Sequence, residues 1–226
     1  MRILGIDTSG KTASVAILDT EKKILLGEHS IYTARTHSQV IMPICKDLLS
    51  ACNMTVQDVD GFAVSVGPGS YTGLRIGIAA VQGMAMVNQT PCAGVSTLAA
   101  LASRAGGGNI LALIHAREDL FYYGIYDFSN RIIPAGTLAN HAEILEILES
   151  YAGHMTLTGD GAELFMQNYA EMIPDALEVS FVPAVLRLQS AAGICTCAEY
   201  VGFGTPADLT ANYLQAVQIQ KKKGEK

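Results

Sequence analysis

Two short stretches of the chain carry the residue types that could do chemistry. The first is "SVGPGSYTGLRIG" at residues 65–77, which holds four glycines, one proline and one arginine between two apolar runs. The second is Asp7, which ends an apolar run just before a Ser-Gly turn. In a phosphate-handling protein, such a loop would cradle the anion, and such an aspartate would hold Mg²⁺ or position a water molecule.

The glycine spacing matches neither of the two common phosphate-binding motifs. A dinucleotide fingerprint needs G-x-G-x-x-G, whereas three residues separate Gly69 from Gly73, and a P-loop needs a lysine that this loop lacks. The loop still joins a predicted strand to a predicted helix, so its amides could face an anion at the helix N-terminus. In the alternative interpretation, Gly67 and Gly69 form a tight turn, while Gly73 and Gly77 make a smooth helix face for close packing.

The other candidate residues leave a similar choice open. Asp7 could serve a ligand, or its side chain could cap the turn that follows it. The five histidines, at 29, 37, 115, 141 and 154, include no pair that one helix would present to a metal. The five cysteines form no repeated CxxC, which predicts free buried thiols rather than a zinc site or disulfides. The histidines and cysteines therefore predict no metal site, and the residues alone assign no catalytic residue and no cofactor.

The composition narrows the class of protein. Half of the 226 residues are apolar, 16% are charged, and the formal net charge is −6. Binding to a nucleic-acid backbone is driven by Lys and Arg. Because this chain is acidic overall, we expect it to bind RNA or DNA poorly on its own. Its apolar runs are too short for a signal peptide or a membrane span, which predicts a cytoplasmic protein without membrane association. The abundance of apolar residues favours an oligomer or a complex, and "KKKGEK" at 221–226 is predicted to be a solvated tail.

The apolar pattern predicts an α/β fold of two related lobes, 1–105 and 106–226, on either side of the glycine-rich stretch 104–109. Each lobe is expected to have three strands followed by alternating helices and strands, which is the plan of the actin-like ATPases and sugar kinases. The predicted strands are 2–8, 12–19, 24–32, 56–66, 92–95, 109–116, 120–128, 131–139 and 154–159. The predicted helices are 36–53, the glycine loop to about 88, 96–103, 141–151, 162–172 and 183–201.

Five stretches of the first lobe, in this order, closely resemble the TsaB family, also called YeaZ. They are "GIDTS" (5–9), "VAI" (15–17), "HSQVIMPICKDLL" (37–49), "VSVGPGSYTGLRIG" (64–77) and "GVSTLAALA" (94–102). The resemblance implies the actin-like fold and a non-catalytic dimerisation or scaffold role in making threonylcarbamoyladenosine at position 37 of tRNA. It implies a TsaD-like catalytic subunit and a TsaE-like ATPase as partners, with tRNA bound only through the complex.

The resemblance also indicates what this chain lacks. The catalytic sister carries a His-x-x-x-His metal pair, and "GVSTLAALA" places Thr97 and Leu101 at the two histidine positions. Leucine offers no lone pair to a metal. One alternative is a small actin-like ATPase or kinase that uses Asp7 and the loop from Gly67 to Gly73. A metalloprotease is disfavoured because the chain contains no HExxH motif.

The two helices at 36–53 and 71–88 carry more apolar and small residues than one buried stripe requires. In the first helix, residues 41, 44, 45, 48 and 52 form the stripe expected to face the chain's own sheet. We expect the surplus residues to face solvent in the free chain and to pack against the matching helices of the TsaD-like subunit. The isolated chain is expected to be able to pair with itself through the same face. These predicted interface residues are Val40, Met42, Leu49, Gly73, Gly77, Ala80 and Met84.

Overall fold

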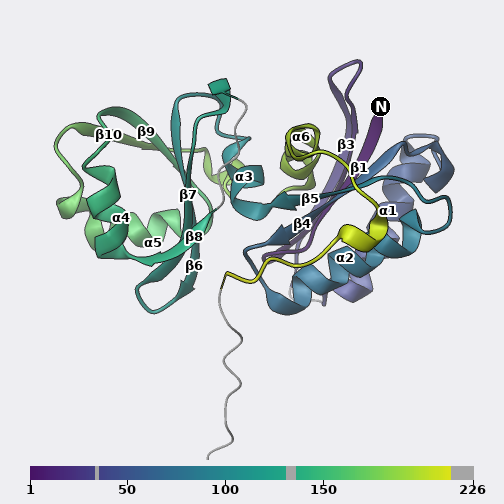
Figure 1. The fold of residues 1–226 in the computed structure, drawn as a ribbon, viewed down its shortest axis with the longest axis horizontal. Coiled ribbons are helices and arrows are strands. Elements are labelled where there is room, and N and C mark those ends of the chain that lie inside the picture. The colour runs from purple at the N-terminus through teal and green to yellow at the C-terminus, as the bar shows by residue number, and fades with distance from the viewer. Residues whose placement is uncertain (34–35, 131–135, 215–226) are drawn as a thin grey trace, which may run out of the picture.

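The structure, a computed structural model, describes residues 1–33, 36–130 and 136–214. Its first sheet has the strand order β3-β2-β1-β4-β5 (Figure 1). The first three strands form an antiparallel meander, as predicted, and β4 and β5 extend the sheet in parallel with β1. The strands are β1 (Arg2–Asp7), β2 (Thr12–Asp19), β3 (Ile24–Tyr32), β4 (Gly61–Gly67) and β5 (Cys92–Ser96).

The second sheet repeats this plan with the order β10-β9-β6-β7-β8. Here β6, β7 and β8 are antiparallel, while β9 and β10 extend the sheet in parallel with β6. The predicted duplication of an α/β unit is therefore confirmed. The strands are β6 (Asn109–Arg117), β7 (Leu120–Tyr126), β8 (Thr137–Asn140), β9 (Gly153–Thr158) and β10 (Leu177–Phe181).

Six α-helices in the described ranges pack around the two sheets. They are α1 (His37–Ala51), α2 (Tyr71–Ala85), α3 (Thr97–Ala102), α4 (His141–Leu148), α5 (Ala162–Tyr169) and α6 (Ala191–Val201). Short 3₁₀ helices lie at Val56–Asp58, Phe128–Asn130, Ala170–Met172, Ala184–Leu186 and Pro206–Asp208. None of these helices is long and apolar enough to cross a membrane.

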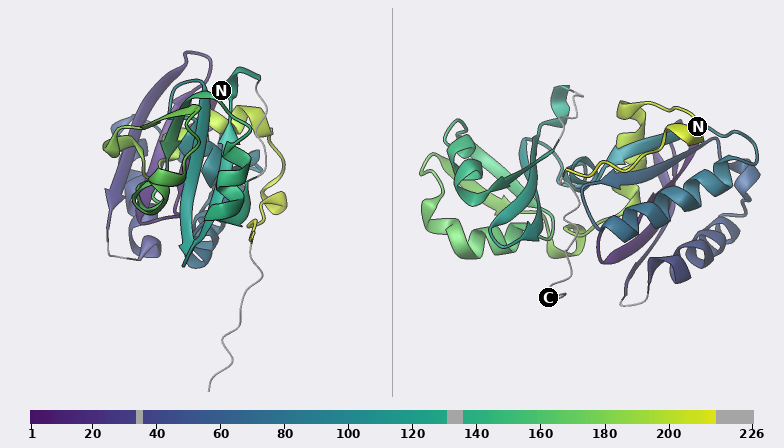
Figure 2. Two further views of the ribbon diagram at one scale, coloured as in Figure 1. Left: turned by 90° about the vertical axis from the view of Figure 1, so that its left-hand side faces the viewer. Right: turned by 60° about the horizontal axis from the view of Figure 1, so that its bottom comes forward.

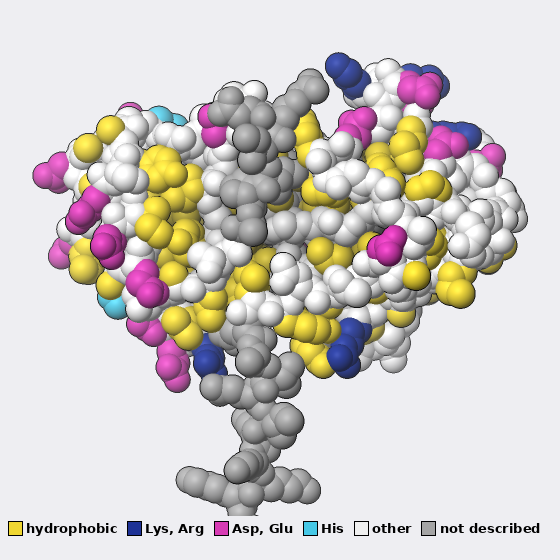
Figure 3. All heavy atoms as spheres, in the orientation of Figure 1, with side chains coloured by type: hydrophobic (Ala, Val, Ile, Leu, Met, Phe, Trp, Pro, Cys, Tyr) yellow, Lys and Arg dark blue, Asp and Glu magenta, His cyan; other side chains and the backbone are white. Residues whose placement is uncertain are grey.

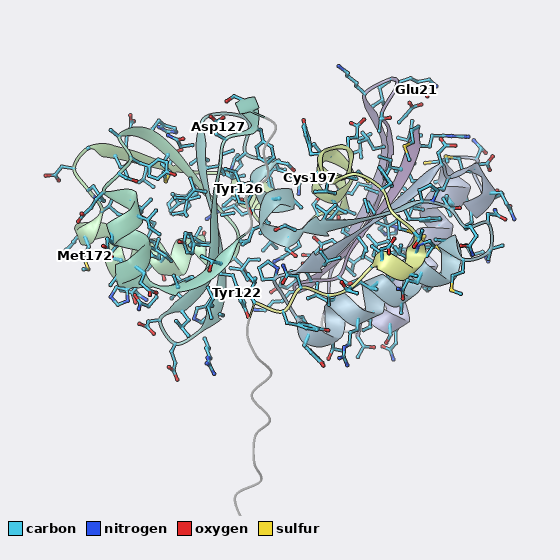
Figure 4. All side chains as sticks on the ribbon, viewed as in Figure 1. Glu21, Tyr122, Tyr126, Asp127, Met172 and Cys197 are labelled. Carbon is cyan, nitrogen blue, oxygen red and sulfur yellow. The ribbon has the colours of Figure 1, made fainter. Side chains whose placement is uncertain are left out.

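The first sheet is buried on both faces because its central strands are apolar on both sides. Ile6 and Val64 face α1 and α2, whereas Ile3 and Ala63 face α6. The second cluster also includes α3 and continues from Cys197 of α6 to Tyr126 of β7 in the second sheet (Figure 4). The opposite face of the second sheet packs against α4 and α5. The lobes therefore share one apolar layer through α3 and α6.

The C-terminal part of the chain returns to the first lobe, which differs from the predicted lobe of 106–226. Helix α6 packs against β1, β2, β4 and β5, and the right-hand view of Figure 2 shows it beside the first sheet. The segment after α6 then runs along α2, where Gln82 Nε2 donates to the carbonyls of Pro206 (3.0 Å) and Leu209 (3.3 Å). Near its end, the amide of Asn212 donates to the Val66 carbonyl at 2.7 Å.

Most predicted elements are present with shifted ends. The final helix begins at Ala191 rather than near 183, because Ser190 provides a side-chain cap to the amide of Ala192 at 3.2 Å. Strand β10 was not predicted, because it is short and most of its side chains are at least partly exposed. Residues 131–135 of one predicted strand and the predicted tail at 221–226 lie outside the described residues.

Candidate functional site

Asp7 lies at the carboxyl end of β1, fully buried. Its Oδ1 accepts hydrogen bonds from the Ser9 amide (2.9 Å) and the Ser9 hydroxyl (2.6 Å), so the side chain caps the turn that follows. Its Oδ2 has no hydrogen-bond partner among the described residues. Burial raises the pKa of Asp7 above its usual range, with the Ser9 hydrogen bonds opposing that shift. Burial therefore makes ionisation of this side chain less favourable than it is in water.

The glycine loop after β4 directs its backbone toward the chain's own atoms. Gly67 (φ +124°) and Gly69 (φ +159°) have backbone conformations that other residues rarely adopt, as a tight turn requires. The amide of Ser70 donates to the Ser9 carbonyl at 2.7 Å, and the amide of Gly73 donates to the Ser70 hydroxyl at 3.2 Å. Two amides that an anion would need are therefore already bonded inside the chain.

The two helix glycines allow α2 to approach the end of β1. A Cβ on Gly73 would lie 2.0 Å from the Thr8 carbonyl oxygen, and one on Gly77 would lie 2.5 Å from the Thr8 hydroxyl. That hydroxyl donates to the Gly73 carbonyl at 2.7 Å, and Nδ1 of His37, the first residue of α1, lies 3.1 Å from the Thr8 carbonyl oxygen. The close packing predicted for these glycines is present, but its partner is the chain's own β1.

The turn between β1 and β2 also packs against a side chain of this same chain. The side chain of Gln189 is buried against Gly10, where a Cβ would meet its amide carbon and oxygen at 2.4 Å. Across the junction, burial raises the pKa of Asp160, while Lys11 of the turn opposes the shift. Lys11 of the first lobe therefore lies close enough to Asp160 of the second to stabilise its charged form.

The two positions that the resemblance matches to metal-binding histidines lie in the apolar layer between the lobes. Thr97 is fully buried and its hydroxyl has no hydrogen-bond partner among the described residues. Leu101 packs with residues of α3, α6 and the second sheet. No group of three or more His, Cys, Asp or Glu side chains in the described ranges could hold a metal. Of the cysteines, all are free thiols, and four are buried while Cys52 is partly exposed.

The expectation that the predicted interface residues of α1 and α2 face solvent in the free chain is wrong for five of the seven, which are buried within this chain. Helix α1 packs against both the sheet and α2, so its buried arc is wider than the predicted single stripe. Only Met42, with 45% of its surface exposed, and the partly exposed Ala80 fit the expectation of a solvent-facing residue. The five buried residues are Val40, Leu49, Gly73, Gly77 and Met84.

Other residues, missed in the sequence, give this face its open apolar surface. Two adjoining grooves of about 330 and 460 Å³ share Met42, Val56 and Met84 in their linings. The second groove adds the exposed residues Ala79, Gly83 and Val87 of α2 and the segment after it. Figure 3 shows apolar side chains along the surface over α2. The spacing of four residues from 79 to 83 to 87 was the signal that could have revealed this ridge.

Comparisons with known proteins agree with this geometry. The family model TsaD, tRNA N6-adenosine threonylcarbamoyltransferase, matches residues 28–222. The tRNA threonylcarbamoyladenosine biosynthesis protein TsaB of Bacillus subtilis is 33% identical over 183 residues, which cover 78% of this chain and 77% of that protein. Its namesake from Escherichia coli is 38% identical over 130 residues, 56% of this chain and 55% of that protein.

A solved structure supports the same relationship over nearly the full length. It is a Pseudomonas aeruginosa protein described as similar to the peptidase YEAZ, with 28% sequence identity and a TM-score of 0.77. The match covers 95% of this chain and 99% of that one. The predicted actin-like α/β fold with two related lobes is confirmed.

Proposed function

Because the chain belongs to the TsaB family, we propose that it is the non-catalytic subunit that pairs with a TsaD-like catalytic subunit. Its role lies in the biosynthesis of tRNA threonylcarbamoyladenosine. In this proposal the catalytic subunit transfers the threonylcarbamoyl group, and this chain contributes a binding surface. The interface comprises Met42 and Ala80, which the sequence predicts, together with Ala79, Gly83 and Val87.

The observation that carries this proposal is the contrast between the filled loop and the open helix face. The Gln189 side chain packs against the turn at Gly10, and the Ser70 amide donates a hydrogen bond to the Ser9 carbonyl. By comparison, Met42 of α1 and Val87 beyond α2 expose 45% and 73% of their surfaces. Exposed apolar side chains beside grooves favour a protein partner, and closely packed own-chain atoms disfavour a phosphate ligand.

The buried interface residues keep a supporting role in this proposal. Val40, Leu49 and Met84 belong to the core beneath the face, and Cys45 Sγ lies 3.9 Å from Met84 Sδ between the two helices. Gly73 and Gly77 hold α2 against Thr8. These residues fix the two helices in position, while the exposed ones contact the partner.

We further propose that a TsaE-like ATPase acts on the assembled pair, and that tRNA is bound only through the complex. The net charge of −6 supports the second point, because it offers no basic field to the phosphate backbone. The same apolar face allows the isolated chain to pair with itself. In that case the TsaD-like subunit competes with the second copy.

A reconstituted tRNA modification assay tests the function. Unmodified tRNA is incubated with the TsaD-like subunit, the TsaE-like ATPase and this chain, with each protein omitted in turn, and threonylcarbamoyladenosine is measured by mass spectrometry. Omitting this chain should abolish multiple turnover, and this chain alone should give no product. Product formed by this chain without the TsaD-like subunit would contradict the non-catalytic role.

The competing function is a small ATPase or kinase that uses Asp7 and the Gly67–Gly73 loop. Titration calorimetry with ATP and Mg²⁺ on the isolated chain separates the two. We expect no saturable heat up to millimolar nucleotide. Saturable binding that Asp7→Ala abolishes, with the fold intact by circular dichroism, would favour the ATPase.

A further inference from the structure

One cation stands at the end of the exposed apolar ridge of α2. The exposed positions Arg75, Ala79 and Gly83 follow one another at intervals of four residues, which places them on one side of α2, and the exposed Val87 follows just after the helix ends. Arg75 is the only charged residue between Tyr71 and Ala85. The ridge is therefore apolar along most of its length and carries its single charge near the helix N-terminus.

Two tyrosines hold the Arg75 side chain in place. Its Nε donates to the Tyr213 hydroxyl at 3.0 Å, and its second terminal nitrogen donates to the Tyr71 hydroxyl. The guanidinium carbon lies 4.0 Å from the Tyr71 ring centre and 6.0 Å from that of Tyr213, and the two rings lie 4.7 Å apart. Stacking of this kind orders a guanidinium group without neutralising its charge.

No carboxylate in the described part of the chain forms an ion pair with Arg75, although acidic residues outnumber basic ones in the whole sequence. The one charged residue lining the two neighbouring grooves is Lys46, also a cation. Arg75 is thus a cation without an ionic partner among the described residues, on a protein that is acidic overall. A bound protein that buried this face would need to supply carboxylates to match it.

We propose that Arg75 sets the register of the partner helix by pairing with a carboxylate on it, an inference that rests on the proposed function. An apolar ridge alone allows a packed helix to slide by a turn or to reverse its direction. One fixed charge at one end removes that freedom, because a wrong register would bury the guanidinium without a counter-charge.

A protein carboxylate fits this site better than an RNA phosphate. Phosphate-backbone binding needs several cations along a path, whereas α2 offers one. Arg and Tyr beside an apolar surface are also the residues that most often dominate protein interfaces. The tyrosines add to this because they fix the guanidinium before the partner arrives, which lowers the entropy cost of forming the pair.

Binding of the TsaD-like subunit to Arg75 variants tests the proposal by calorimetry at two salt concentrations. Arg75→Glu should weaken binding by at least about 30-fold, and Arg75→Met by less. Arg75→Lys should restore only part of the affinity, because lysine lacks the planar fork that donates to both tyrosine hydroxyls. Tyr213→Phe keeps the ring but loses the acceptor, and should cost only a few-fold.

Lys22→Glu is the matched control, since it makes the same charge change on the turn between β2 and β3, where the side chain is 70% exposed. It should bind like the wild-type chain. Each Asp and Glu on the interface helices of the TsaD-like subunit is then changed to Arg. One of these changes should restore binding to Arg75→Glu while weakening binding to the wild-type chain. The affinity of Arg75→Met for the TsaD-like subunit should also depend less on salt concentration than that of the wild-type chain.

The outcomes distinguish failure of the Arg75 register role from failure of the proposed pairing with a TsaD-like subunit. If the wild-type chain does not bind the TsaD-like subunit at all, the proposed function fails. If the wild-type chain and the control bind, and Arg75→Glu binds equally well, the register role is overturned. If Arg75→Glu leaves subunit binding intact but reduces tRNA binding by the assembled pair, Arg75 serves RNA, which also overturns the proposal.

Discussion

Helix α2 takes part in two regions of the molecule. One is the strand-end junction, where α2 meets Asp7–Lys11, the end of β1 and the turn that follows, by packing against Thr8. The other is the open face, where α2 exposes Ala79 and Gly83 beside Met42 and Val87. The glycines of α2 have opposite roles in these two regions. At the junction, Gly73 and Gly77 bring the helix against Thr8 so closely that no side chain would fit. On the open face, no atom lies within 4 Å of a Cβ built on Gly83. At the first region, the chain's own atoms leave no room for an added side chain. At the second, the surface around Gly83 is open.

The largest expected effect comes from adding one methyl group at the junction. Gly73→Ala places its Cβ against the Thr8 backbone carbonyl, so the strand end or α2 must move. We expect a loss of about 3 kcal/mol in the free energy of unfolding, at the upper end of overpacking costs, and a fall of several degrees in Tm. Gly83→Ala is the matched change on the open side and should gain about 0.5 kcal/mol from helix propensity. Thermal and urea unfolding measure the stability of both variants. Equal changes in stability would mean that the two glycines do not differ in their packing.

The next largest effect concerns binding rather than folding. Gly83→Arg and Met42→Asp each put a charge on the open face, where the partner would bury it without a counter-charge. We expect each to weaken binding to the TsaD-like subunit by at least about 2 kcal/mol, the scale of an interface hot spot. Melting should change little. Unchanged binding, or binding lost only through unfolding, would show that the interface lies elsewhere.

A smaller effect should appear in the pH dependence of stability. Because burial raises the pKa of Asp7, the folded chain favours its neutral form, while the unfolded chain ionises it near the ordinary value. This contribution to stability is present below the unfolded pKa and is lost as the pH rises toward the folded pKa. Asparagine at position 7 does not ionise, so Asp7→Asn avoids this loss. Between pH 4 and pH 7, the free energy of unfolding of the variant, measured by urea unfolding, should rise relative to that of the wild-type chain. A parallel pH dependence for the two proteins would mean that Asp7 is ionised in the folded state.

The smallest perturbation is a labelling experiment on the cysteines. Burial raises the pKa of Cys45, Cys92 and Cys197 to about 11 and that of Cys195 to about 12. Thiolates are the reactive form, so iodoacetamide at pH 8 should modify only the partly exposed Cys52 in the folded chain. Peptide mass spectrometry identifies the labelled residue, and Cys52→Ser should leave the folded chain unlabelled. Fast labelling of Cys45 would indicate that α1 and α2 separate readily.

The fold was largely predictable because its strands and helices follow simple apolar periods. The stripe at Ile41, Ile44 and Leu48 is buried as predicted, and β2 and β3 have the predicted bounds. The return of α6 to the first sheet was not predictable from local pattern. It depends on contacts between residues far apart in sequence, such as Cys195 Sγ lying 3.7 Å from the carbonyl oxygens of Ile3 and Ala16.

The candidate site was harder to predict, because its residue types have several uses. The sequence could not decide whether Gly73 and Gly77 face this chain or a partner, since both choices need the same glycines. It could not reveal that Gln189 fills the turn at Gly10, because nothing in the local pattern links residues that far apart. Helical spacing alone could have found the ridge from Arg75 to Val87, since that rule needs no tertiary contact.

The most direct test of this account compares the two regions in one reconstituted modification assay. Lys11→Ala and Asp7→Asn change the junction, Gly83→Arg changes the open face, and each is added at equal concentration to the TsaD-like subunit, the TsaE-like ATPase and tRNA. The account predicts near-normal threonylcarbamoyladenosine from the two junction variants and little or none from Gly83→Arg, with all three variants folded. Lost activity in the junction variants together with normal activity in Gly83→Arg would contradict it.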